Sequence, residues 1–68
     1  MTLTIELDRE DDGRWIAEVV ELPGVLVYGQ SRDETVEQAK ALAFRTIADR
    51  LEHGESVPEM GDVFSVVS

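Results

Sequence analysis

Residues 19–36 read VVELPGVLVYGQSRDETV, and this stretch decides the fold. Leu22-Pro23-Gly24 ends one apolar strand, because proline cannot donate to a sheet ladder and glycine weakens a strand. Residues 25–28 are apolar on both sides and predict a further strand, after which Gly29-Gln30-Ser31 opens a helix. None of these residues supplies an evident nucleophile, metal cluster or phosphate cradle. The stretch therefore indicates a scaffold for binding.

The helix has a well-marked start and end. Ser31 is the expected N-cap, since Glu34 stands three residues later and completes a Ser-x-x-Glu capping box. Gly54 suits the left-handed position after a helix, and Pro58 cannot resume it, so the helix should end near His53. Apolar residues at steps of three and four predict a stripe that packs on a sheet. We assign to it Val36, Ala39, Ala43, Ile47 and Leu51, widened by Phe44 and Ala48.

The remaining strands follow from alternation. Residues 2–8 alternate apolar and polar side chains, and residues 14–20 form a second strand after the turn Asp11-Asp12-Gly13. Residues 62–68 read as a last strand. The prediction is a single α+β domain over residues 1–68, in the order βββαβ, with the helix packed on one face of an antiparallel meander. Trp15 and Phe44 are expected to fill the space between sheet and helix.

Length and charge limit the function. A chain of 68 residues without cysteine has a small core and no disulfide to reinforce it, which favours self-association. The net charge of -9 repels phosphate backbones and anionic lipid, so neither nucleic acid nor membrane is an expected partner. No apolar run approaches the roughly 20 residues that span a bilayer. We expect a cytoplasmic protein.

The ordered set Asp12-Gly13, residues 15–18, Leu22-Pro23-Gly24, Gly29 and the helix from Ser31 to Ala39 resembles the HicB-like antitoxin family over nearly the whole chain. The resemblance implies a truncated ribonuclease-H-like fold. It also implies a non-enzymatic protein that binds and occludes a small basic toxin of the HicA type, which cleaves messenger RNA. The acidic charge suits such a partner. The alternative is an orphan module that associates only with itself.

Two features depart from that family. Many members carry a C-terminal DNA-binding domain, whereas this chain stops after one strand, so direct promoter binding is not expected. Val25 stands where the family frequently has cysteine, and the substitution keeps an apolar strand.

Two groups of residues invite a catalytic interpretation. His53 is the only histidine, and its expected role is at the negative end of the helix dipole, since a zinc site needs further ligands. Asp8, Glu10, Asp11 and Asp12 lack the spacing of a calcium loop and read as a solvated hairpin tip. A metal-dependent nuclease is the least favoured hypothesis. We predict no enzyme activity, metal or cofactor.

The sheet face away from the helix is the candidate binding site. With a single helix available, one face lacks cover from within the chain, and exposed apolar patches usually mark interfaces. We expect a homodimer or larger assembly, or a partner, at Ile16, Val20, Leu26 and Tyr28, with Val25 and Val27 as the alternative pair from the third strand. Leu42, off the predicted helical stripe, is either a second contact or a lone exposed leucine.

Overall fold

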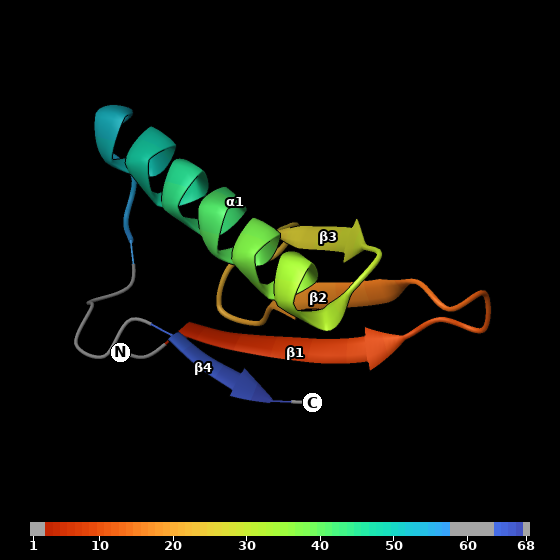
Figure 1. Cartoon of the computed structure of the whole chain (residues 1–68). Coiled ribbons are helices and arrows are strands. Elements are labelled where there is room, and N and C mark those ends of the chain that lie inside the picture. Colours follow the sequence, from red (N-terminus) through yellow and green to blue (C-terminus); the bar gives the residue numbers. More distant parts are fainter. Residues whose placement is uncertain (1–2, 58–63, 68) are drawn as a thin grey trace.

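The computed structural model describes residues 3–57 and 64–67 (Figure 1). It confirms an α+β fold in the order βββαβ. The elements are β1 (Leu3–Arg9), β2 (Trp15–Val19), β3 (Leu26–Gly29), α1 (Arg32–Glu52) and β4 (Phe64–Val67). Of the predicted last strand, residues 62, 63 and 68 lie outside the described residues.

The four strands form one sheet in the order β3-β2-β1-β4. The first three strands are an antiparallel meander, whereas β4 pairs with β1 in parallel. The connection through α1 therefore returns the chain to the opposite edge from β3. Helix α1 runs diagonally over one face of the meander, and its C-terminal end projects beyond the sheet (Figure 1). Among the described residues, no helix lies over the other face of the sheet.

The core lies between α1 and the meander. Alternate residues of β1 and β2 enter it, as the sequence predicts, together with one face of the helix. Leu22 and Val25 are also buried, which anchors the β2–β3 connection to the same core. The buried apolar residues are Leu3, Ile5, Leu7, Ala17, Val19, Leu22, Val25, Val36, Ala39, Ala43 and Ile47.

The turn at Leu22-Pro23-Gly24 positions the third strand. The N–H of Val25 donates to the carbonyl of Leu22 at 3.0 Å, and Gly24 has a φ of 91°. Proline in the second position and glycine at positive φ in the third are the requirements of a type II turn. Val25 is the fourth residue of this turn, so β3 begins at Leu26, one residue later than the sequence predicts.

The junction between β3 and α1 is unusually close. A Cβ placed on the buried Gly29 would collide with Oγ1 of Thr35 and lie 3.2 Å from its Cβ. Thr35 is itself fully buried, and its hydroxyl donates to the carbonyl of Ser31 at 2.6 Å. Only glycine therefore allows the strand end and the first helical turn to touch.

The helix begins and ends where the sequence predicts. The Ser31 hydroxyl accepts from the N–H of Glu34 at 3.2 Å, and Gly54 follows the C-cap His53 with a φ of 71°. The expected capping box is only half formed, because the Glu34 carboxylate accepts from Gln38 at 3.0 Å. Glu34 therefore stabilises the first turn through a side-chain hydrogen bond to Gln38 on the helix surface.

The predicted helical stripe is partly wrong. Phe44 is 50% exposed and Leu51 59% exposed, and Ala48 is exposed as well. The buried face of the helix extends away from Phe44, toward the buried Thr35 and the half-buried Leu42. Leu42 packs against the core. Trp15 is half-buried, with the Arg9 guanidinium 5.6 Å from its ring centroid.

Candidate functional site: the open face of the sheet

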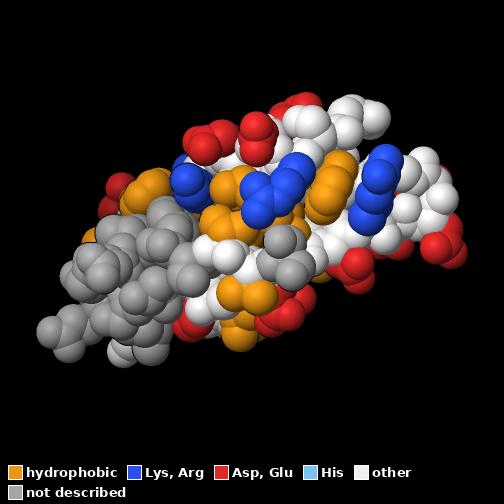
Figure 2. Space-filling view, turned by 60° about the horizontal axis from the view of Figure 1, so that its bottom comes forward, with side chains coloured by type: hydrophobic (Ala, Val, Ile, Leu, Met, Phe, Trp, Pro, Cys, Tyr) orange, Lys and Arg blue, Asp and Glu red, His pale blue; other side chains and the backbone are white. Residues whose placement is uncertain are grey.

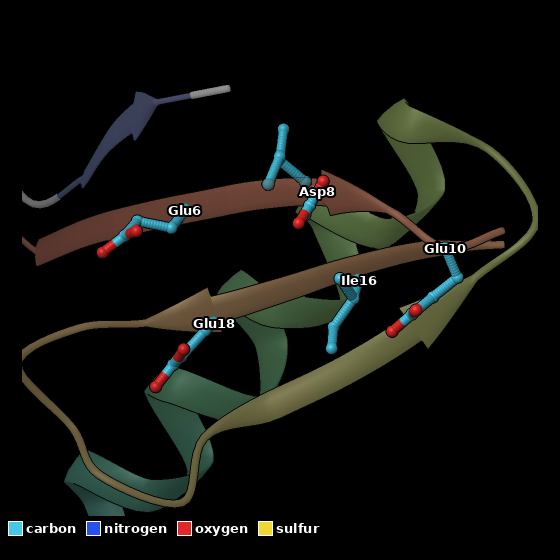
Figure 3. Close-up of a pocket in the computed structure, with 6 residues that line it drawn as sticks. Glu6, Asp8, Glu10, Ile16 and Glu18 are labelled. Atoms are coloured by element: carbon cyan, nitrogen blue, oxygen red, sulfur yellow. The ribbon is translucent and has the colours of Figure 1, made fainter.

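Strand alternation divides the sheet into two unlike faces. Residues 3, 5, 7, 17 and 19 point toward α1 and are buried. The intervening residues point away from the helix, and Figure 3 shows several of them on the near side of the sheet with α1 behind it. We call this surface the open face; it comprises Thr4, Glu6, Asp8, Arg14, Ile16, Glu18, Val20, Leu26 and Tyr28.

One half of the open face is apolar, and it contains the four residues that the sequence singled out. Ile16 lies opposite Tyr28 across the β2–β3 pair, and Leu26 lies one row along. Val20, Leu26 and Tyr28 are between 41% and 46% exposed. We call Ile16, Val20, Leu26 and Tyr28 the apolar strip. Their role as an interface remains a prediction.

The alternative pair from the third strand does not reach this face. Val25 is buried, and Val27 packs against the core from the helix side. The choice between the two pairs was open in the sequence because residues 25–28 are apolar at every position. The type II turn settles it by fixing which residues of β3 face the helix.

The other half of the open face is acidic. A shallow hollow of about 300 Å³ is lined by Glu6, Leu7, Asp8, Glu10, Ile16 and Glu18 (Figure 3). We call its four carboxylates, Glu6, Asp8, Glu10 and Glu18, the acidic cluster. Glu6 and Glu18 stand directly opposite each other on β1 and β2. Like charges in this position destabilise a strand pair.

No basic side chain offsets the acidic cluster. Within the described part of the chain, none of its four carboxylates takes part in an ion pair, although Asp8 accepts from the N–H of Arg9 at 2.8 Å. Arg14 is the single basic residue on the open face, and its guanidinium lies over the Tyr28 ring at 4.7 Å. Figure 2 shows the molecule with the β4 edge brought forward. In this view, Lys and Arg side chains alternate with hydrophobic side chains across the middle of the molecule.

Glu21 closes one end of the β1–β2 pair, a role that the sequence did not reveal. Its Oε1 accepts from the N–H of Thr4 at 2.6 Å. Burial raises the pKa of Glu21, but the hydrogen bonds from Thr4 outweigh it and hold the pKa below its usual value. No local motif announces this contact, because it joins residues that are 17 positions apart.

The hairpin tip is held by its own local contacts. Asp12 accepts from the N–H of Arg14 at 3.0 Å and from its guanidinium at 2.8 Å. The hydrogen bond from the Arg14 backbone is the main reason that the pKa of Asp12 is lowered. The predicted acidic hairpin tip therefore divides, since Asp8 and Glu10 belong to the hollow instead.

The other candidate residues lie apart from this face. His53 is exposed at the end of α1, with Nδ1 2.7 Å from the carbonyl of Asp49 and 3.5 Å from its carboxylate. Among residues 3–57 and 64–67, no group of three or more His, Asp or Glu side chains is placed to hold a metal ion. The same residues include no helix with the length and apolar character needed to cross a membrane.

The open face is thus half apolar and half acidic, and nothing in the described chain covers it. No family model, curated protein or solved structure matches this chain.

Proposed function

We propose that the protein is a non-enzymatic, cytoplasmic binding module that binds and occludes a basic protein through its open face. The observation that carries this proposal is the acidic cluster lying directly beside the apolar strip on an uncovered sheet face. A partner with a complementary surface would combine apolar contacts with Lys or Arg side chains. Such a partner is a small basic toxin of the HicA type, in keeping with the resemblance to HicB-like antitoxins.

The acidic cluster would favour binding in two ways. A chain with a net charge of -9 attracts a basic protein over a distance and speeds its association. At contact, a Lys or Arg side chain placed between Glu6 and Glu18 would also relieve the repulsion that these two carboxylates impose on the free sheet. The free protein therefore carries an unfavourable interaction that a basic partner removes.

The apolar strip would supply the part of the affinity that does not depend on salt. Burial of apolar surface contributes roughly 25 cal/mol per Å², and tyrosine is enriched at the centres of interfaces. Tyr28 is 46% exposed and lies beneath the Arg14 guanidinium, so it offers a large, partly ordered surface. Occlusion of a toxin requires no catalytic group from this chain.

The test is inhibition of messenger-RNA cleavage by the small basic protein encoded in the reading frame next to this gene. We expect the wild-type protein to inhibit cleavage and the double variant E6Q/E18Q to lose inhibition. The control E52Q/E55Q carries the same change of formal charge, from -9 to -9 + 2 = -7, on exposed residues remote from the open face. It should inhibit as the wild type does.

Two results would count against the proposal. Equal loss in both double variants would show that only the overall charge matters. A wild-type protein that neither binds nor inhibits the neighbouring basic protein would contradict the antitoxin-like function. The orphan, self-associating module would then be the better hypothesis, and the free edge of β3 is the observation in its favour.

A further inference from the structure

The outer edge of β3 carries unpaired backbone groups at two positions. Strand β3 is the last strand on its side of the sheet. The N–H of Val19 donates to the carbonyl of Val25 at 3.0 Å, so the odd-numbered residues of β3 direct their backbone groups toward β2. Leu26 and Tyr28 therefore direct theirs outward. Within the described residues, no hydrogen bond reaches these outward groups.

This edge lacks the charges that usually protect edge strands. Residues 25–31 read VLVYGQS and contain no charged side chain, although 31% of the whole chain is charged. An added strand would meet Leu26, Val27 and Tyr28 without facing a carboxylate. Two copies of a chain with a net charge of -9 can approach each other at this edge without bringing carboxylates together.

We propose that two copies of this chain pair through the outer edges of β3, antiparallel about a two-fold axis at Val27. In that register Leu26 lies opposite Tyr28 of the second copy, and Tyr28 opposite its Leu26. Each of these pairs exchanges both backbone hydrogen bonds, so all the outward groups of Leu26 and Tyr28 are satisfied. The product is one continuous sheet of two four-stranded halves.

Charge disfavours the other obvious dimer, in which two open faces pack together. That arrangement would bring the eight carboxylates of two acidic clusters into one interface, where each copy supplies only Arg14, which already pairs with Asp12 and lies over Tyr28. Edge pairing instead places Leu26 between Glu18 of its own copy and Tyr28 of the other. Arg14, which lies over Tyr28, would then be about two strand spacings, roughly 10 Å, from Glu18 of the second copy.

Edge pairing also leaves the candidate binding site free. A two-fold axis perpendicular to the sheet keeps both helices on one side and both open faces on the other. The two apolar strips become continuous across the seam, with an acidic cluster on each flank. This dimer does not depend on the proposed partner, so either inference can fail without the other.

Single cysteines test the register, because the wild-type chain has none. We expect V27C to form a disulfide-linked dimer under mild oxidation, since Val27 faces its own copy in a non-hydrogen-bonded pair with Cα atoms about 4.5 Å apart. L26C and Y28C should stay unlinked, because each would be offset from its own copy by two residues, more than about 7 Å. A41C on the exposed helix surface controls for random collision.

Solution mass provides the second measurement. The wild type should have the mass of two chains in sedimentation equilibrium. L26P should have half that mass. Proline at position 26 removes an N–H that points away from β2, so the hydrogen bonds between the two copies are lost while those between β3 and β2 remain. Three results would overturn the proposal. The first is a disulfide-linked dimer of L26C or Y28C in place of V27C, and the second is a V27C dimer that forms no faster than the A41C dimer. The third is a wild-type protein with the mass of one chain.

Discussion

At the scale of single residues, the contact between Gly29 and Thr35 determines how β3 meets the helix. In the sequence, Gly29 is only the first residue of the segment that opens the helix. The structure assigns it a different task, because Gly29 is buried and its missing side chain is what admits Thr35. Thr35 in turn fills the space with a hydroxyl that is hydrogen-bonded to Ser31.

Gly29→Ala should therefore destabilise the protein by about 1–3 kcal/mol, the usual cost of overpacking. The cost should be smaller when Thr35 is already alanine, because the colliding Oγ1 is then absent. Urea denaturation of the two single variants and the double variant measures this coupling. Additive effects would show that the two side chains do not compete for the same space.

The Glu21 contact predicts a pH dependence. Its folded-state pKa lies below the ordinary value of 4.5, so the ionised carboxylate contributes stability above that pH and loses it as the pH falls through the folded-state pKa. The difference in unfolding free energy between wild type and E21Q should therefore be largest above about pH 4.5 and shrink in acid. A difference that is constant from pH 7 to pH 3 would contradict the role of the Thr4 hydrogen bond.

At the scale of elements, local chemistry in the sequence predicts where the helix lies, but not how it is rotated. Ser31, Gly54 and the Leu22-Pro23-Gly24 turn are signals that act within a few residues, and the structure bears out each of them. Phe44 is exposed because the helix is rotated so that Thr35 and Leu42 face the core, and Leu51 is exposed because it lies at the end of α1 that projects beyond the sheet (Figure 1). The same limit applies to β4, whose parallel pairing with β1 has no local signal.

The helix cap gives a prediction at this scale. Ser31→Ala removes the acceptor of the Glu34 N–H and should cost about 1 kcal/mol. Glu34→Ala should cost only a few tenths of that, because the Glu34 side chain bonds Gln38 and not the cap backbone. Thermal denaturation compares the two variants. Equal losses would indicate that the reciprocal half of the capping box forms in solution.

At the scale of the whole molecule, the two faces of the sheet have separate tasks. The helix side holds the core, and the open face combines an apolar strip with carboxylates that weaken the sheet they stand on. The sequence predicts the apolar strip from alternation and the single helix. It does not predict the acidic cluster, because Glu18 is brought beside Glu6 only by the β1–β2 register.

The most direct test of the open face as a binding surface is calorimetric titration of the neighbouring basic protein into two leucine variants. Leu26 on the apolar strip is 41% exposed, and Leu51 at the helix end is 59% exposed, so L26S and L51S make the same change on two exposed surfaces. Binding through the open face predicts that L26S weakens binding at least tenfold, the equivalent of about 1.4 kcal/mol, and that L51S leaves it unchanged. Binding that is weakened by L51S and unaffected by L26S would contradict it.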